Sequence, residues 1–170
     1  MPLYDLPTLC TLRATWHAAG ERLVFTNGVF DLLHAGHVAY LSQARTLGER
    51  LVVGINADGS TQALKGPLRP IVGEAERAAL IGALRVVDAT VIFSETTAET
   101  LVAALRPEIY VKGGDYLDAD GQPAFARLPE GRVVAAYGGQ VAILPFAEGH
   151  STSTIIERIV ARYGNVGKAS

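Results

Sequence analysis

A strand, a glycine turn and a helix follow one another between residues 22 and 47, and this order constrains the fold more than any other feature of the chain. The segment Arg22–Thr26 is short and apolar, with β-branched residues, as expected of a buried parallel strand. Apolar side chains then recur at helical spacing from Val38 to Leu47. Asn27 and Gly28 form the turn between the two. This segment therefore predicts one strand–helix unit of an α/β sheet.

The same alternation continues along the chain. Strand-like apolar runs are expected at Leu23–Thr26, Arg50–Ile55, Thr90–Phe93 and Ile109–Val111, with helices at about 35–47, after Asp58, at 74–84 and at 98–105. The pattern predicts an α/β fold: a Rossmann-like parallel sheet with helices on both faces. Ligands of such sheets bind at the carboxyl ends of the strands.

Both ends of the chain flank this core. A first helix is expected at about 8–19, capped near Thr8, and a closing helix at about Thr152–Arg162, with a loose tail at 164–170. We expect a single domain over residues 1–170, with its core at about 22–163.

The region before the closing helix leaves two interpretations open. Residues 116–130 are rich in turn signals and predict an irregular excursion. Arg132–Ala136 and Gln140–Leu144 fit either a hairpin or a short helix followed by a strand. We favour the second interpretation, because it continues the parallel sheet.

Composition excludes several classes of protein. The chain has 170 residues, 49% of them apolar, which is enough for the core of one domain. Its 15 basic and 17 acidic residues give a net charge of −2, so the chain has no overall excess of positive charge that would attract a nucleic-acid backbone. The single cysteine, Cys10, excludes an internal disulfide, and its apolar neighbours indicate packing. No export signal opens the chain, and no apolar run reaches the ~20 residues that span a bilayer. We expect a cytoplasmic protein with no nucleic-acid or membrane partner.

His34 and His37 fall in the first turn of the helix expected at 35–47. Residues three apart share a helix face, so the two imidazoles point the same way, and Gly36 lets a ligand approach the backbone. Free N–H groups and the positive end of the helix dipole attract anions there. The segment therefore predicts a phosphate site.

The two histidines have two other interpretations. They would bind zinc if His17, His150 or Cys10 supplied a third ligand, but the chain has no recognised zinc spacing. An ordinary surface helix with incidental histidines is the second alternative. Neither alternative explains the Asn-Gly-x-Phe-Asp turn just ahead of the histidines.

The stretch from Thr26 to His37 resembles the HxGH signature of the nucleotidyltransferase superfamily. Further segments resemble the heptose 1-phosphate adenylyltransferase family: Leu64–Pro70, Glu76-Arg77, Val111–Tyr116 and Glu148–Ile156. The matching blocks run in order from about Leu23 to Ile159. The resemblance implies a nucleotidyltransferase fold. It also implies that ATP, accompanied by Mg²⁺, transfers AMP to D-glycero-β-D-manno-heptose 1-phosphate, giving ADP-heptose for lipopolysaccharide synthesis and pyrophosphate.

The resemblance also implies a set of site residues. The catalytic residues would be His34, His37 and Lys65. These three would also bind the nucleotide, together with Asn27, Gly28, Val29, Phe30, Lys112, Gly113, Gly114, Asp115, Ser151, Thr152 and Ser153. The sugar phosphate would be bound by Asn56, Asp58, Arg69 and Arg77. No protein metal ligand is expected.

Some of these residues also have structural interpretations. Arg77 is placed to pair with Glu74 or to serve a subunit contact, and the hydroxyl run from Ser151 would cap a helix whatever the function. Asp31 and Asp88 are expected to be structural anchors, although Asp31 is placed to touch a magnesium-bound water.

The implied reaction needs positioning and neutralisation of charge more than it needs a base. The attacking phosphate oxygen is already ionised near neutral pH, and pyrophosphate leaves without a proton. The absence of a carboxylate from the motif positions is therefore no objection.

Two other functions remain open. One is a cytidylyltransferase acting on glycerol 3-phosphate or another alditol phosphate, and the other is a non-catalytic nucleotide-sensing domain. Cytidylyltransferases for glycerol phosphate carry Arg-Thr-Glu-Gly before the hydroxyl run, where this chain has Phe146-Ala147-Glu148-Gly149 followed by His150. This difference favours the heptose branch. We expect a homo-oligomer, with a dimer as the favoured state.

Overall fold

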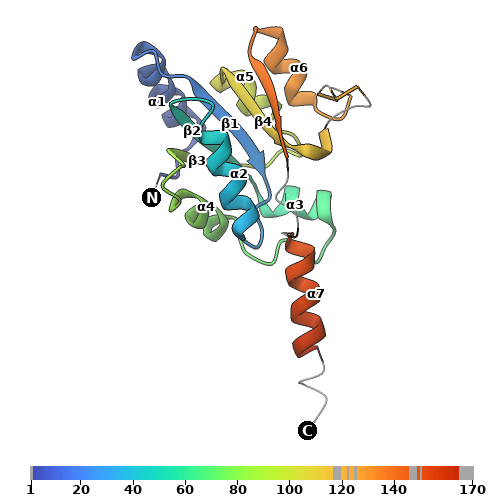
Figure 1. Ribbon diagram of the computed structural model, residues 1–170. Helices are drawn as coiled ribbons and strands as arrows, with labels where there is room; N and C mark the ends of the chain where they lie inside the picture. The colour runs from blue at the N-terminus through green and yellow to red at the C-terminus, as the bar shows by residue number, and fades with distance from the viewer. Residues whose placement is uncertain are drawn as a thin grey trace.

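The computed structural model describes residues 2–116, 120–121, 123–124, 126–145, 149 and 151–164. The described strands form one parallel sheet in the order β3-β2-β1-β4-β5 (Figure 1). They are β1 (Leu23–Gly28), β2 (Arg50–Asn56), β3 (Ala89–Phe93), β4 (Ile109–Gly113) and β5 (Gln140–Leu144). The predicted α/β class is confirmed.

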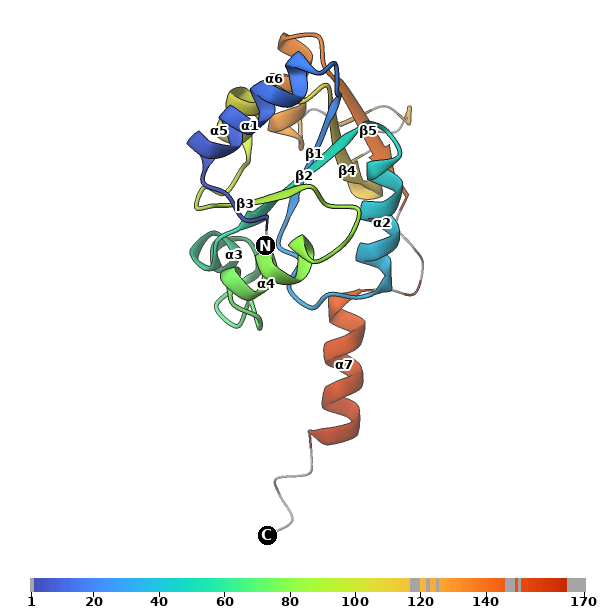
Figure 2. The same cartoon turned by 90° about the vertical axis from the view of Figure 1, so that its left-hand side faces the viewer.

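Helices cover both faces of this sheet. They are α1 (Leu6–Ala18), α2 (Ala35–Arg45), α3 (Asp58–Lys65), α4 (Glu74–Gly82), α5 (Glu99–Leu105), α6 (Pro129–Ala136) and α7 (Thr152–Tyr163), with a 3₁₀ turn, η1, at Gly114–Tyr116. Buried side chains of α1, α5 and α6 share one core cluster, and those of α2 and α4 share another (Figure 2). The two clusters lie on opposite faces of the sheet.

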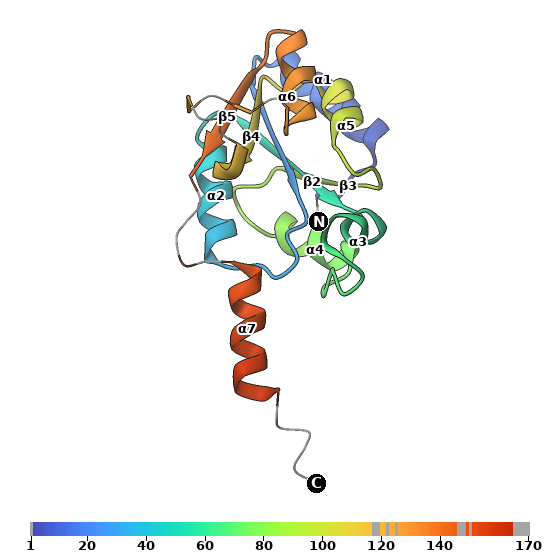
Figure 3. The same ribbon diagram turned by 90° about the vertical axis from the view of Figure 1, so that its right-hand side faces the viewer.

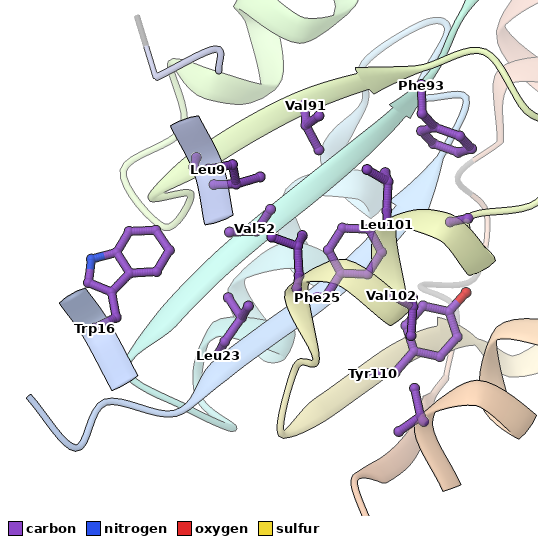
Figure 4. Close-up of a cluster of buried hydrophobic side chains, with 14 of the residues drawn as sticks. Leu9, Trp16, Leu23, Phe25, Val52, Val91, Phe93, Leu101, Val102 and Tyr110 are labelled. Carbon is purple, nitrogen blue, oxygen red and sulfur yellow. The ribbon is translucent and has the colours of Figure 1, made fainter. Parts of the chain in front are cut away.

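Strand β1 shows how the two cores arise from the sequence. Leu23 and Phe25 pack with α1 and α5 in the first cluster, whereas Val24 between them packs in the second (Figure 4). Side chains alternate between the faces of a strand, so a strand buried on both sides reads as a continuous apolar run. All three residues are fully buried.

The strand order places β1 beside β4, at the point where the winding of the sheet reverses. From β1 the chain builds outward through β2 to β3, then returns to the other side of β1 to add β4 and β5. A crevice opens outside the carboxyl ends of two strands at such a switch point. The turn after β1 and the Lys112-Gly113 end of β4 both lie there.

The segment that left two interpretations open is a helix followed by a strand. Helix α6 leads into β5, and β5 pairs in parallel with β4, so no hairpin forms. The described residues between Tyr116 and Pro129 are irregular, as expected, apart from an isolated bridge.

The predicted start of the first helix is wrong by two residues. Helix α1 begins at Leu6, and Asp5 caps it by accepting a hydrogen bond of 2.9 Å from the Thr8 N–H. Asp5 is as good a cap as Thr8, and Pro7 fits the first helical turn, so the helix extends to the earlier cap.

Helix α7 projects away from the rest of the described chain (Figure 3). None of its residues is fully buried, and Ile159, Val160 and Tyr163 are more than half exposed. Among the described residues, no helix combines the length and the apolar character needed to cross a membrane. The tail at 165–170 lies outside the described residues.

Candidate active site

A cleft of about 1050 Å³ lies at the carboxyl ends of the strands. It is lined by the turn after β1, the start of α2, the end of α3, the loop after β3, the end of β4 and the starts of α6 and α7. A second cavity, of about 660 Å³, is lined by α1, the loop before β4 and the loop before β5, near the amino ends of the strands. None of the predicted site residues lines that second cavity, so the cleft at the carboxyl ends is the candidate site.

The two histidines of the HxGH segment stand together at the start of α2. His34 is the residue before the helix and His37 lies in its first turn. Their rings are stacked, with centroids 3.8 Å apart and planes 20° apart, and both residues line the cleft. The predicted common face of the two imidazoles is confirmed.

His37 is the more constrained of the two histidines. Phe30 packs edge-on against its ring at a centroid distance of 5.3 Å. Burial, and secondarily the neighbouring His34, lower the pKa of His37 to about 4. His37 is therefore neutral near pH 7, and it meets a ligand as a hydrogen-bond donor or acceptor rather than as a cation.

The turn before α2 approaches the cleft closely with its backbone. Phe30 adopts a left-handed conformation with φ of 50°, which is uncommon for a residue other than glycine. A Cβ at Gly28 would lie 3.1 Å from the Phe30 ring, so the turn leaves little room for a side chain there. This packing holds the N–H groups of Val29 and Phe30 in a fixed turn beside the start of α2.

Asn27 joins β1 to β4 at the switch point. The hydroxyl of Tyr110 donates to Asn27 Oδ1 at 2.7 Å, and Lys112 Nζ donates to the Asn27 carbonyl at 3.1 Å. Burial lowers the pKa of Lys112 to about 8, an effect that the charge of Glu130 opposes. Lys112 therefore stays mostly protonated at pH 7, with its charge held at the floor of the cleft.

The loop after α3 brings two further cations to the cleft. Lys65, the last residue of α3, is exposed, and Arg69 lies four residues further on; both line the cleft. Arg69 Nε donates to Asp31 Oδ2 at 2.5 Å, and Asp31 Oδ1 accepts the N–H groups of Ile71 and Val72 at 2.8 and 2.9 Å. Asp31 is the structural anchor that was predicted, and it ties this loop to the turn after β1.

Arg77 does not reach the cleft. Its side chain is fully buried, and it donates to the carbonyls of Val72, Val29 and Asn56 and to the carboxylate of Asp58. The burial of Arg77 contradicts the expectation that it holds the sugar phosphate. The same expectation for Asp58, which is absent from the cleft lining, stays a prediction. The expected alternative pairing of Arg77 with Glu74 is also wrong, because its partner is Asp58.

The other residues expected to bind ligands differ in their placement. Asn56, Gly113 and the hydroxyl run from Ser151 to Ser153 line the cleft. Ser151 caps α7 by accepting the Thr154 N–H at 3.0 Å, as predicted. Gly114 begins η1 and is absent from the cleft lining. The side chain of Asp115 lies outside the described residues, as do residues 146–148 and His150.

Sequence reasoning missed several lining residues, among them Thr96 and Thr97 after β3, and Arg127 and Glu130 around the start of α6. The two threonines carried a usable signal, because every segment that follows a strand of a parallel sheet is a candidate for the binding edge. Arg127 and Glu130 carried none, because only the path of the excursion brings them to the cleft.

Comparison with known proteins adds to this geometry. The chain matches the family model for cytidylyltransferase-like proteins over residues 25–158. It is 52% identical to the bifunctional protein HldE of Pelobacter propionicus over 150 residues, which cover 86% of this chain and 28% of that protein. It is 46% identical to the bifunctional protein HldE of Geobacter sulfurreducens over 160 residues, covering 94% of this chain and 31% of that protein. The chain thus spans about three tenths of the length of these curated relatives.

Solved structures show the same fold. The lipopolysaccharide core biosynthesis protein from Thermoplasma volcanium superposes with a TM-score of 0.59 at 31% identity, and the match covers 77% of this chain and 100% of that one. Pantoate-beta-alanine ligase from Francisella tularensis superposes with a TM-score of 0.62 at 15% identity, covering 96% of this chain and 78% of that one. The second match supports the fold alone.

Proposed function

Because the chain belongs to the cytidylyltransferase-like family, we propose that it transfers AMP from ATP to D-glycero-β-D-manno-heptose 1-phosphate, giving ADP-heptose and pyrophosphate. The observation that carries this proposal is the cleft itself. Its two stacked histidines, at the start of a helix, lie in one lining with Lys65, Arg69 and Lys112. Such a set of donors and cations suits a nucleoside triphosphate and a second, phosphorylated substrate.

The heptose substrate is supported by the relatives. Several curated relatives that are 45 to 52% identical over most of this chain carry the name HldE, and the 31% identical neighbour is a lipopolysaccharide core biosynthesis protein. We also propose a cytoplasmic location, because a chain with a single cysteine suits a reducing compartment. A homodimer is also proposed, and sedimentation of the purified protein tests it.

The nucleotide phosphates are proposed to lie along the start of α2. The N–H groups of Val29, Phe30 and the first turn of the helix offer hydrogen bonds without needing charged side chains. His37, which is neutral, donates a single hydrogen bond to a phosphate oxygen. Most of the positive charge that balances the transition state then comes from Lys65 and the helix dipole.

The acceptor phosphate supplies the nucleophile. Its oxygen attacks the α-phosphorus of ATP, the bond between the α-phosphorus and its bridging oxygen breaks, and pyrophosphate leaves with the bonding electrons. No proton has to be removed from an ionised phosphate, so this step requires no general base. Arg69 and Lys112 are the cations proposed to hold the acceptor in line.

Magnesium is proposed to enter with ATP. Among the described residues, no group of three histidine, cysteine or acidic side chains is arranged to hold a metal ion, and both oxygens of Asp31 already accept hydrogen bonds. Magnesium commonly binds through substrate phosphates and waters, where it neutralises phosphate charge. The protein residues described here would bind the magnesium–nucleotide complex through its phosphates.

Two assays test the proposal. Purified protein is incubated with Mg-ATP and either heptose 1-phosphate or free heptose, and pyrophosphate and ADP-sugar are measured. We expect product from the phosphate alone, since the cleft offers phosphate binders to the acceptor. Transfer to unphosphorylated heptose would contradict the mechanism, and the absence of any pyrophosphate would favour a non-catalytic nucleotide-binding domain.

The nucleotide base is tested separately. The same assay with CTP and glycerol 3-phosphate distinguishes the cytidylyltransferase alternative, and we expect ATP with heptose 1-phosphate to be the better pair. A preference for CTP and an alditol phosphate would contradict the heptose assignment but leave the nucleotidyltransferase assignment intact.

A further inference from the structure

One part of the cleft lining, which we call the lobe, comes from the α5 and α6 side of the sheet, whereas the histidines come from α2 on the other side. This lobe is lined by Thr97 from the loop after β3, Tyr116 from η1, and Arg127 and Glu130 around the start of α6. None of these residues belongs to the phosphate-binding turn or to the α3 loop. The lobe is therefore built from other segments than the proposed phosphate-binding part of the cleft.

Glu130 is the most informative group in the lobe, because a carboxylate is seldom buried without a reason. The residue is 4% exposed. Its Oε1 accepts the N–H of Ala98 at 2.9 Å, which ties α6 to the loop before α5. The hydroxyl of Tyr110 also lies close enough to interact with this carboxylate, but it donates its proton to Asn27 Oδ1. Glu130 lines the cleft as well. An ionised carboxylate has about four acceptor positions, so Glu130 can accept further hydrogen bonds from a ligand in the cleft.

The charge of Glu130 decides which ligand suits this lobe. A carboxylate repels phosphate groups, so the triphosphate of ATP is disfavoured there. An ionised carboxylate has only acceptor positions, and it therefore binds groups that carry O–H or N–H donors. Within the proposed reaction, the part richest in such donors outside the nucleotide is the sugar of the acceptor.

Lys112 lines the same cleft and lies near Glu130. Its ammonium group is held at the switch point by the carbonyl of Asn27, 3.1 Å away, and it feels the charge of Glu130. A sugar 1-phosphate carries its charge at one end and its hydroxyls at the other. With its phosphate at Lys112, such a molecule would extend its hydroxyls toward Glu130.

We propose that Glu130 is a specificity residue that accepts hydrogen bonds from hydroxyl groups of the acceptor sugar, so that this lobe selects polyhydroxylated sugar 1-phosphates. This inference rests on the proposed function and goes beyond it by naming the part of the cleft that recognises the sugar. Thr97 and Arg127 border the same lobe and add further hydrogen-bonding groups.

The test uses the full chain carrying Glu130→Gln. Glutamine keeps an oxygen that accepts the Ala98 N–H, so the tie between α6 and the loop is retained, while the charge is lost. Glu95→Gln is the matched control, since Glu95 is an exposed residue in the same loop as Thr97 and is absent from the cleft lining. Steady-state kinetics are measured with Mg-ATP and heptose 1-phosphate varied in turn.

We expect Glu130→Gln to raise the KM for heptose 1-phosphate by about ten- to a hundredfold, the usual effect of losing a hydrogen bond to a charged group. The KM for Mg-ATP should stay within about twofold of the wild-type value, because Glu130 is proposed to contact the sugar phosphate and not the nucleotide. Glu95→Gln should match the wild type for both substrates. The unchanged KM for Mg-ATP also shows that the variant is folded.

Deoxy analogues of the acceptor supply a readout that a structural role would not affect. For the analogue that lacks the contacted hydroxyl, wild type and Glu130→Gln should have the same KM, whereas the difference should persist with the other analogues.

Two results would overturn the inference while leaving the proposed function standing: a wild-type KM for heptose 1-phosphate in Glu130→Gln, or a penalty that falls on Mg-ATP. Failure of the wild type to use any sugar 1-phosphate would refute the proposed function, and this inference with it.

Discussion

Replacing the buried Arg77 by methionine should destabilise the protein strongly and should affect catalysis only through folding. Methionine has a similar length and fills much of the same space, but it donates no hydrogen bond. The change removes the four hydrogen bonds by which Arg77 joins α4 to the turn after β1 and to the end of β2. The substitution therefore tests whether Arg77 stabilises the fold or binds the substrate.

The size of the effect follows from the groups left behind. Three backbone carbonyls lose a donor, and a buried polar group without a partner costs about 1–3 kcal/mol. Asp58 adds little, because its side chain is 41% exposed and water replaces the guanidinium. The effects of neighbouring groups on stability do not add fully, so we expect the free energy of unfolding to fall by about 3–5 kcal/mol in total. A typical domain has a free energy of unfolding of roughly 5–15 kcal/mol.

Urea and thermal unfolding measure this loss. For a chain of this length, 1 kcal/mol corresponds to about 2–4 °C in Tm, so a decrease of about 10 °C is expected. Arg85→Met is the matched control, because Arg85 is exposed near the end of α4, and a surface change of this kind shifts stability by no more than about 0.5 kcal/mol.

The reasoning is refuted if Arg77→Met unfolds at the wild-type midpoint. A wild-type midpoint combined with a raised KM for the sugar phosphate would restore Arg77 to the binding site, as the sequence alone had indicated. At a temperature where the variant is fully folded, we expect its KM values to be those of the wild type.

Three further predictions concern the site. His34→Ala and His37→Ala should each lower turnover about a hundredfold, the usual effect of losing one stabilising donor, without lowering Tm; near wild-type turnover at saturating substrate would remove the role assigned to that histidine. Lys65→Ala should lower turnover and raise the KM for Mg-ATP, because a cation beside the phosphates acts in both the ground and transition states; if steady-state kinetics show neither change, Lys65 is an ordinary exposed lysine. The pKa of His37 is about 4 in the folded protein and about 6.5 in an unfolded chain. Between these two values the unfolded state binds more protons than the folded state. His37 should therefore make the protein less stable as the pH falls from about 6.5 to about 4. Urea unfolding at several pH values should show that the free energy of unfolding decreases less with falling pH in His37→Asn than in the wild type. An equal decrease in both proteins would contradict the lowered pKa of His37.

Local patterns in the sequence were enough to predict most of the elements. The strands β1 to β4 and the helices α2, α4 and α5 were expected close to their observed positions, because a strand buried on both faces and a helix with one apolar face each leave a periodic pattern in neighbouring residues. Boundaries were less well predicted. Helix α1 starts at Leu6 because two residues, Asp5 and Thr8, compete to cap the same turn.

The phosphate-binding part of the candidate site was also accessible from the sequence. His34, His37 and the segment from Asn27 to Phe30 lie within eleven residues, so the local geometry from the end of β1 to the start of α2 places them with little help from the rest of the fold. The two imidazoles stack although His34 is the extended residue before the helix and only His37 lies in its first turn.

The functions of the remaining charged residues were decided by contacts between segments that are distant in the sequence. Nothing in the local pattern distinguishes Arg69 from Arg77, yet one lines the cleft and the other is fully buried. Glu130 comes close enough to Lys112 to affect its pKa because the chain returns through α6 beside β4. Burial and the distances between charges depend on the packed structure, and these two quantities decide whether a charged side chain supports the fold or faces a ligand. The sequence alone determined where phosphates are expected to bind, and only the tertiary structure decided which charges are free to contact the rest of the substrate.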